Sequence, residues 1–452
     1  MNTKIIYSIS TILFFFLTHG IVAQVAKPEA NPVRFSKAVK DQKNEKCATI
    51  LYQEYLKKRF AGYSADNFEA WLHSKIDNTK RKVAQKSGNE IITIPVVVHV
   101  VHNNLALGTG ANITDEQVLS QITVLNQDFR RMEGTPGYNE NPVGADAGIE
   151  FCLAQRDPDG SATNGIEHIN ISTDSWDMAA VEGNLKPRYN WDTSKYLNIY
   201  VCKFGGDLSK LGGYGLPPTD SDVAGLEDFV DIVPAENDGV VIDYRVFGSS
   251  DLYPNGEFFT NYGKGRVATH EMGHFFGLRH IWGDGDCSAT DYCDDTPAAA
   301  AANSSCTPID SCPEQPGFDM IENYMDYTPE ECQNVFTMDQ KIRMLTVLDN
   351  SVRRTSLRNS NGCLAPDLGI NDTLLDGFVI YPNPAKDNLY INTKNSESFT
   401  YCIYNAIGQK ISSGAGDADK PGTISLEGVN QGLYTITILC QGNITTKRFI
   451  KE

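Results

Sequence analysis

One stretch of the sequence decides the expected fold and chemistry: His270-Glu271-Met272-Gly273-His274-Phe275-Phe276-Gly277-Leu278-Arg279-His280. His270 and His274 are four residues apart, so a helix presents both imidazoles on one face, about one turn apart. Gly277 can adopt the positive φ that ends a helix and turns the chain, which would bring His280 round as a third ligand. Three imidazoles leave the fourth position of a tetrahedral zinc ion open to water, as in a catalytic site.

Glu271 directly follows the first histidine, where its carboxylate suits a general base that takes a proton from a zinc-bound water. It is therefore not expected to be a ligand. The alternative is a helix that carries three histidines by coincidence. The two-histidine motif alone does occur by chance, but the added glycine and the third histidine argue against coincidence. The stretch predicts a catalytic zinc site.

A second motif strengthens this interpretation. The extended histidine motif resembles that of the metzincin clan of zinc peptidases, whose members need a methionine in a tight turn beneath the metal. That methionine is supplied 45 residues after His280 by Asn323-Tyr324-Met325-Asp326-Tyr327. Between the two motifs lies Asp294-Asp295-Thr296-Pro297. In this combination the chain resembles the bacterial secreted members of the pappalysin family, peptidase family M43, over about residues 90 to 365.

The resemblance implies a secreted zinc endopeptidase with an α+β catalytic domain: a twisted mixed sheet, an active-site helix and an irregular C-terminal subdomain. Zinc would polarise the scissile carbonyl of a protein or peptide substrate, and Glu271 would carry a proton from the bound water to the leaving amine. The resemblance also makes Met325 a hydrophobic floor under the zinc, and Tyr327 a hydrogen-bond donor to the oxyanion. The same likeness sets the catalytic domain at residues 89–365.

The first 88 residues are expected to lie outside the catalytic domain. Residues 1–23 have the charged start, apolar run and small-residue end of a signal peptide, and no later stretch is apolar for long enough to span a bilayer. Residues 24–88 are polar and lysine-rich, with two helical patterns, and resemble a helical pro-segment that lies across the cleft. Cys47 is the only cysteine before residue 152, and we hypothesise that its thiolate takes the fourth zinc position before processing. A half-buried helix cysteine is the alternative.

Composition limits the partners. Lys and Arg number 39 and Asp and Glu number 57, which gives a formal net charge of −18. Such an acidic chain is a poor candidate for binding nucleic acid or an anionic membrane. Its 452 residues are too many for one ordinary domain and suggest two or three.

Cysteines cluster in the irregular stretch that follows the histidine motif. Because an exported protein meets an oxidising environment, most of the eleven cysteines are expected to form disulfides. The resemblance implies the pairs Cys287–Cys312 and Cys306–Cys332, although sequence alone does not fix the connectivity.

The same stretch carries an acidic loop. Family members bind a structural calcium ion here, and the resemblance makes Asp291, Asp294 and Thr296 its ligands, since hard oxygen donors on a flexible loop suit that ion. The alternative is a solvated acidic turn.

Glu331 follows the methionine turn. In relatives an acidic residue in this neighbourhood lies at the bottom of the pocket for the residue after the scissile bond, where it selects arginine or lysine. We assign that role to Glu331, because a buried carboxylate would need such a cation. An exposed acidic turn is the alternative.

After a linker at residues 366–376, the character of the chain changes to short alternating strands, which predicts a small all-β sandwich at residues 377–452. The order of its motifs, beginning with Tyr381-Pro382-Asn383-Pro384-Ala385, resembles the C-terminal sorting domain of the type IX secretion system. That resemblance implies the type IX machinery as a partner and a secreted or cell-surface protein. A substrate- or glycan-binding β-module is the alternative.

A rival function for the whole chain is a non-catalytic, calcium-dependent adhesin or binding module built on a peptidase fold, since a fold does not guarantee activity. Such proteins usually lose the glutamate or a ligand. Here every catalytic position is filled, which favours the enzyme.

Overall fold

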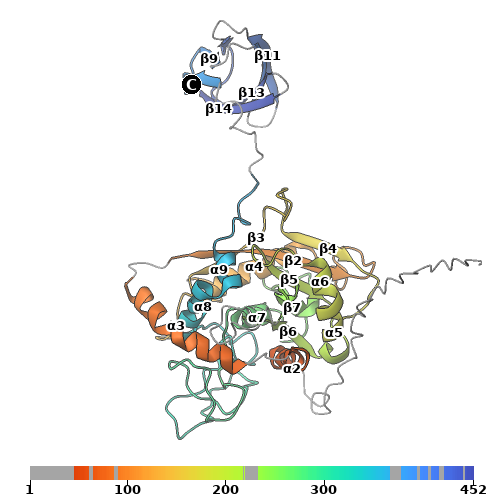
Figure 1. The fold of residues 1–452 in the computed structure, drawn as a ribbon, viewed down its shortest axis with the longest axis vertical. Coiled ribbons are helices and arrows are strands. Elements are labelled where there is room, and N and C mark those ends of the chain that lie inside the picture. The colour runs from red at the N-terminus through yellow and green to blue at the C-terminus, as the bar shows by residue number, and fades with distance from the viewer. Residues whose placement is uncertain are drawn as a thin grey trace, which may run out of the picture.

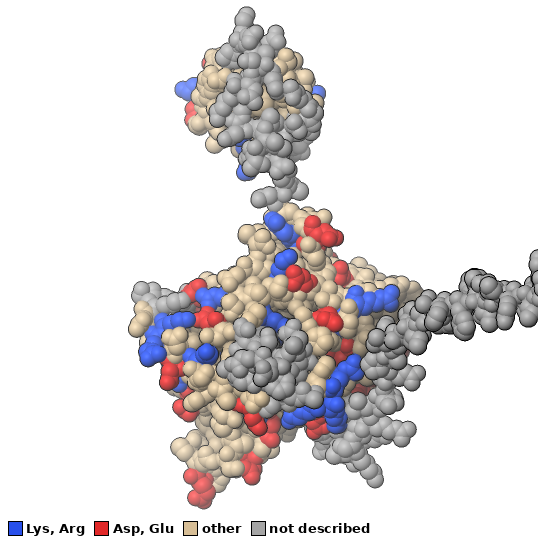
Figure 2. Space-filling model, viewed as in Figure 1, with Lys and Arg blue, Asp and Glu red and all other residues tan. Residues whose placement is uncertain are grey.

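The computed structural model describes residues 45–60, 65–85, 90–216, 218, 233–366, 378–393, 398–405, 409–416, 422–440 and 443–452. The predicted signal peptide lies outside these ranges, as does nearly all of the predicted linker. None of the helices within the described ranges combines the length and the apolar character needed to cross a bilayer. Figure 2 shows basic and acidic side chains interspersed over the face in view.

A seven-stranded sheet forms the centre of the catalytic part, in the order β1-β6-β7-β5-β2-β3, with β4 also paired to β2. Its strands are β1 (Glu45–Cys47), β2 (Ile92–His102), β3 (Ile149–Leu153), β4 (Ile166–Asn170), β5 (Leu197–Cys202), β6 (Leu211–Gly215) and β7 (Val240–Asp243). All pairs are parallel except β6 with β7, so the sheet is mixed, as predicted. The long β2 reads as a near-continuous apolar run because both faces of the sheet are covered.

Helices cover one face of this sheet (Figure 1). They are α4 (Asp115–Phe129), α7 (Arg266–Phe275), α8 (Met338–Asn350) and α9 (Val352–Arg358). The Thr114 side chain begins α4 by accepting a hydrogen bond from the amide of Gln117. Apolar residues of α4, α7 and α8 share a core with Val96, Val98 and Val100 of β2.

The other face of the sheet carries a second core, around Tyr200, Cys202 and Tyr214. It is covered by α2 (Thr49–Arg59) and by a run of short helices: α5 (Met178–Ala180), the π-helix η1 (Val181–Leu185), α6 (Lys186–Tyr189), η2 (Gly206–Leu208) and η3 (Ala235–Asn237). One more 3₁₀ turn, η4 (Tyr244–Val246), follows β7. The second N-terminal helix, α3 (Ala65–Gln85), lies instead along α8 (Figure 1).

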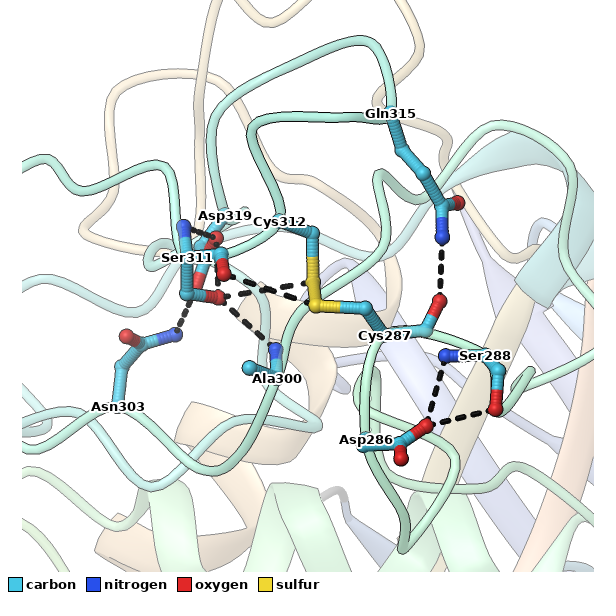
Figure 3. The surroundings of a disulfide bond; sticks show 9 residues. All are labelled: Asp286, Cys287, Ser288, Ala300, Asn303, Ser311, Cys312, Gln315 and Asp319. Carbon is cyan, nitrogen blue, oxygen red and sulfur yellow. Dashed lines mark hydrogen bonds between the residues drawn. A yellow bond between two sulfur atoms is a disulfide. The ribbon is translucent and has the colours of Figure 1, made fainter.

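Disulfides hold the irregular stretch between α7 and α8. Cys287–Cys312 and Cys306–Cys332 join the pairs that the resemblance implied, and Cys152–Cys363 is a third disulfide that the sequence did not indicate. Figure 3 shows that polar side chains surround the first of these, and that the Ser311 hydroxyl donates to the Asp319 carboxylate at 2.7 Å. Cross-links of this kind stabilise a segment that has little regular structure of its own.

The C-terminal strands form two small sheets with a core of their own. One sheet has the order β11-β10-β13-β14 and the other β12-β9-β8. The strands are β8 (Phe378–Tyr381), β9 (Asn388–Thr393), β10 (Phe399–Asn405), β11 (Lys410–Gly416), β12 (Gly422–Ser425), β13 (Gly432–Cys440) and β14 (Asn443–Lys451). This all-β arrangement agrees with the predicted sandwich.

Candidate metal centre

Helix α7 carries the first two histidines and Glu271, and an acidic side chain fixes where it begins. The buried carboxylate of Glu330 accepts hydrogen bonds from the amides of Lys264, at 2.6 Å, and Val267, at 2.7 Å. A carboxylate at a helix N-terminus satisfies amides that have no partner within the helix and favours the helix dipole. Sequence analysis missed this role of Glu330, since 63 residues separate it from Val267.

The end of α7 follows the prediction for Gly277. This glycine has a φ of 88°, and the amide of Leu278 donates to the Gly273 carbonyl at 2.9 Å. The resulting turn reverses the chain and brings His280 back to the helix.

The three histidines converge through their Nε2 atoms. Nε2 of His274 lies 3.1 Å from Nε2 of His270 and 3.1 Å from Nε2 of His280. Each Nδ1 atom faces an oxygen: the Tyr324 carbonyl at 2.7 Å, the Leu278 carbonyl at 2.9 Å, and the Asp284 carboxylate at 2.5 Å. Because these oxygens accept, the ring proton resides on Nδ1, and each Nε2 lone pair points at the common centre.

Burial favours the neutral form of the first two rings. It lowers the pKa of His270 well below the usual value and, with His280 as a second cause, lowers the pKa of His274 to about 3. Three imidazoles with their Nε2 atoms turned inward, all completely or nearly buried, are the donor set that a zinc ion takes. The residues present therefore fit the metal that the motif implies.

Cys47 is the fourth member of this group. Its Sγ and the three histidine nitrogens all lie within 4.8 Å of one another, and no other converging group of three or more His, Cys, Asp or Glu exists in the described ranges. The cysteine is at the end of β1, which runs parallel to β6 with Cys47 opposite Gly213. β1 is thus an added strand at the edge of the sheet, not the helix position considered as an alternative.

Glu271 is buried beside this group. Its Oε2 lies 3.4 Å from Cys47 Sγ and accepts from the Thr49 hydroxyl at 3.1 Å. Burial raises the pKa of Glu271 to about 8. The carboxylate is therefore within reach of whatever occupies the position of the thiol, and its surroundings favour the protonated form.

The methionine turn contacts α7 at Gly273 and at His270, whose Nδ1 faces the Tyr324 carbonyl. Met325 is buried, and a Cβ at Gly273 of α7 would lie only 2.4 Å from its sulfur, so a glycine is needed at this contact. The Tyr327 hydroxyl is 3.3 Å from Nε2 of His280 and 3.4 Å from the Cys47 carbonyl. Met325 and Tyr327 thus both border the centre.

A lysine fills the pocket next to the centre. Lys46 is 1% exposed, and its ammonium donates to the side-chain oxygen of Gln333 and to the Asp326 carbonyl at 3.4 Å. Burial lowers the pKa of Lys46 to about 8, opposed by the negative charges of Glu330 and Asp326. Acceptor oxygens and nearby carboxylates thus partly offset the cost of burying the ammonium.

Glu331 is not part of this pocket. It is exposed beside the disulfide of Cys306, with its carboxylate 4.0 Å from that sulfur, whereas its neighbours Glu330 and Gln333 are buried. The assignment of Glu331 to the bottom of the pocket is therefore corrected. The turn after Met325 directs residue 331 outward, as in the exposed acidic turn considered as the alternative.

The acidic loop brings two of the three expected calcium ligands together. Asp291 is buried and accepts from the Thr296 hydroxyl at 2.8 Å, while Asp294 is exposed. Burial raises the pKa of Asp291 to about 7. Calcium binding here remains a prediction.

Comparison with known proteins identifies the chain. A family model described as pregnancy-associated plasma protein-A, peptidase M43, matches residues 248–349. An extracellular metalloprotease of Sordaria macrospora is 34% identical over 259 residues, which cover 57% of this chain and 75% of that protein. The chain belongs to the M43, or pappalysin, family of metallopeptidases. Another such relative, from Neurospora crassa, is also 34% identical, and the match covers 56% of this chain and 73% of the relative.

Two solved structures resemble this M43 peptidase. A promirolysin mutant of Tannerella forsythia is 36% identical, with a TM-score of 0.56, and the match covers 70% of this chain and 97% of that one. Mature mirolysin of Tannerella forsythia in complex with a cleaved peptide is 39% identical, with a TM-score of 0.51, and the match covers 60% of this chain and 97% of that one. A second family model, the secretion system C-terminal sorting domain, matches residues 379–452. The protein is a metalloendopeptidase, and its sorting domain directs type IX secretion to the cell surface or the medium.

Proposed function

We propose that this M43 peptidase cleaves peptide bonds with Glu271 as the general base, on a zinc ion held by His270, His274 and His280. The observation that carries the proposal is the convergence of three Nε2 atoms whose Nδ1 partners are all oxygens, with the Glu271 carboxylate beside them. Bound zinc supplies Lewis acidity, which lowers the pKa of water and polarises a carbonyl.

The chain's own groups carry the proton and steady the developing charge. In its carboxylate form Glu271 accepts a proton from the attacking water, and the protonated side chain then gives it to the leaving amine; burial, which raises the pKa, helps it to hold the proton between these two steps. The Tyr327 hydroxyl lies next to His280 and donates a hydrogen bond to the oxyanion of the substrate. Met325 holds the floor of the site.

The N-terminal segment keeps the precursor latent in this proposal. Cys47 Sγ belongs to the converging group, so a thiolate there fills the fourth ligand position and excludes water. β1 at the same time covers the edge of β6, where a substrate strand would pair. Residues 24–88 act as a pro-segment, which agrees with the name of the related promirolysin.

The substrate preference is for lysine or arginine after the scissile bond. Lys46 supports this preference, because its basic side chain lies fully buried there. The Gln333 side-chain oxygen and the Asp326 carbonyl accept from its ammonium, and Glu330 supplies negative charge. A neutral side chain would leave the Gln333 oxygen without this donor and would leave the charge of Glu330 without the cation.

We place a structural calcium ion at the acidic loop, with Asp291 and Thr296 as ligands and Asp294 joining them. The support is the buried Asp291 carboxylate, which lies 2.8 Å from the Thr296 hydroxyl, so that two hard oxygen donors are close together in the loop. Chelation of calcium should lower the melting temperature, and calcium but not zinc should restore it. Unchanged melting would exclude the ion.

The test of the main proposal uses the full chain after proteolytic processing, in wild-type form and as Glu271→Ala, with zinc measured in both. Wild type should cleave a peptide library before lysine or arginine. The variant should hold zinc but cleave about 10²–10⁴-fold more slowly. If both proteins hold stoichiometric zinc and neither cleaves, the chain is a binding module and the proposal is wrong.

A further inference from the structure

Tyr52 of α2 ends in a buried polar cluster on the face of the sheet opposite α7. Its ring is fully buried, and its hydroxyl donates to Glu182 Oε2 at 2.8 Å. Three groups of the catalytic domain complete the cluster: the Tyr214 hydroxyl donates to Glu182 Oε1 at 2.8 Å, the Lys186 ammonium pairs with Oε1 at 2.7 Å, and the Asn237 amide lies 3.2 Å from Oε2.

The cluster is shaped for a phenol. The Lys186 ammonium lies 5.1 Å from the centre of the Tyr52 ring and 5.0 Å from that of Tyr214, so it faces both rings in cation–π contact. The two rings are 4.8 Å apart. An aromatic ring fits between Lys186 and Tyr214, and its hydroxyl reaches the carboxylate of Glu182.

Departure of α2 would leave this cluster unsatisfied. Oε2 of Glu182 would retain only the long contact to Asn237, and one face of the Lys186 ammonium would lose its ring. The surrounding apolar side chains, which now pack on Leu51, Tyr55 and Leu56 of α2, would be uncovered as well. A buried carboxylate without its donor is costly, and a large uncovered apolar surface usually marks a binding site. Glu182 also lies in the π-helix η1, a type of irregularity that is frequent at functional sites.

The position of the cluster connects it to the substrate strand. Tyr214 belongs to β6. The residue before it in this strand, Gly213, lies opposite Cys47 at the metal centre. A peptide that pairs with β6 has side chains that alternate between the two faces of the sheet. Some therefore point toward the Lys46 pocket, and those on the other face point toward Tyr214.

We propose that, in the processed enzyme, the cluster of Glu182, Lys186 and Tyr214 binds the side chain of a substrate tyrosine located before the scissile bond. The inference rests on the proposed peptidase function. Lys46 and Tyr52 lie on opposite sides of Cys47 in the chain. In this proposal the two sites keep that order along a bound peptide, so a basic residue after the scissile bond places the tyrosine before it. Lys186 disfavours a cation here, Glu182 disfavours an anion, and phenylalanine leaves Oε2 without a donor.

Peptide pairs test this inference on the processed, zinc-loaded full chain. The two peptides of a pair both have lysine after the scissile bond. They differ only at one position before that bond, where one peptide has tyrosine and the other has phenylalanine. At the position that faces Glu182, tyrosine should raise kcat/KM about tenfold over phenylalanine, because the hydroxyl donates to a charged acceptor. Equal values at every position would overturn the inference.

A variant and a competitor sharpen the result. Glu182→Gln should reduce the ratio toward one, because a neutral amide accepts more weakly than a carboxylate. If that variant does not fold, peptides of residues 46–59 with Tyr52 or with Tyr52→Phe can compete for wild-type enzyme, and the tyrosine form should inhibit at about tenfold lower concentration. If no peptide is cleaved at all, the peptidase proposal fails; cleavage without discrimination refutes the tyrosine site alone.

Discussion

The two helices of the N-terminal segment contact the catalytic domain in different ways. Helix α2 follows Cys47 directly and buries apolar residues against the face of the sheet behind β6. Helix α3 lies along α8, where Phe68, Trp71 and Leu72 pack on Val347 (Figure 1). The first helix therefore occupies the substrate side of the molecule, and the second braces the scaffold behind it.

An ion pair joins α3 to the catalytic domain, and we call this contact of Glu69 and Phe68 with Arg343 and Gly277 the brace. Glu69 of α3 forms two hydrogen bonds of 3.0 Å with the buried guanidinium of Arg343, which also donates to the Gly277 carbonyl at 2.9 Å. Phe68 lies against Gly277 as well. Helix α3 thus holds the turn that carries His280 to the metal centre. The comparison separates two functions that we propose for the N-terminal segment. β1 and α2 block the metal centre, and α3 stabilises the turn at Gly277 that brings His280 to it.

The largest expected effect comes from breaking the brace. Glu69→Ala in the full chain leaves the Arg343 guanidinium buried without a carboxylate, and should lower the free energy of unfolding by about 3–5 kcal/mol. Unfolding of the wild-type and variant precursors in denaturant measures this difference in the free energy of unfolding. Lys82→Ala is the matched control on the same helix, because its ion pair with Asp349 is half exposed and should contribute at most about 1 kcal/mol. Equal losses in the two variants would show that α3 does not brace the turn.

Removal of the blocking group should change activity instead. Cys47→Ala opens the ligand position but leaves β1 on β6. If the thiolate, and not this cover, keeps about 99% of the precursor molecules inactive, peptidase activity of the unprocessed chain should rise about a hundredfold. The readout is the initial rate on a peptide with lysine after the scissile bond, under conditions that prevent processing. Glu69→Ala serves as the control, because it weakens the brace without freeing the ligand position. A precursor variant as latent as wild type would contradict the switch.

The metal centre and its proposed blocking group could be predicted in part from the sequence, whereas the contact of α3 with α8 could not. The histidine spacing and Gly277 are local patterns, which is why the helix, its end and the return of His280 followed from sequence. Glu69 and Arg343 are 274 residues apart, and neither lies in a motif. Their pairing depends on how α3 packs on α8, which no local pattern encodes.

The same limit explains the correction at Glu331. A turn has no fixed period, so the sequence did not tell which of the residues after Met325 points inward, and the structure selects Glu330 and Gln333. The fold class followed from alternating patterns and resemblance, and so did the C-terminal sandwich. By contrast, β1 was unexpected, because three residues become a strand only through pairing with β6.

A smaller effect, on zinc affinity, should follow from removing the carboxylate that orients His280 after the turn at Gly277. His270 and His274 donate to backbone carbonyls, whereas His280 depends on the Asp284 carboxylate. Asp284→Ala should therefore weaken zinc binding by about 10–100-fold in a chelator competition. Asp286→Ala is the control, since that exposed carboxylate accepts hydrogen bonds from the amide and the hydroxyl of Ser288. Unchanged zinc affinity would mean that the turn alone orients His280.

The smallest effect concerns the helix that receives the brace. The Thr337 side chain caps α8 and accepts from the amide of Gln340, whose own side chain returns to the Thr337 amide and also bonds Asn323 in the methionine turn. Thr337→Ala should lower the free energy of unfolding by about 1 kcal/mol. Because the cap belongs to the catalytic domain, the loss should be the same before and after removal of the N-terminal segment. If processing removes α3 as proposed, the Glu69→Ala loss should exist only in the precursor. A Thr337→Ala loss confined to the precursor would therefore show that α8 is stabilised through α3 and not by its own cap.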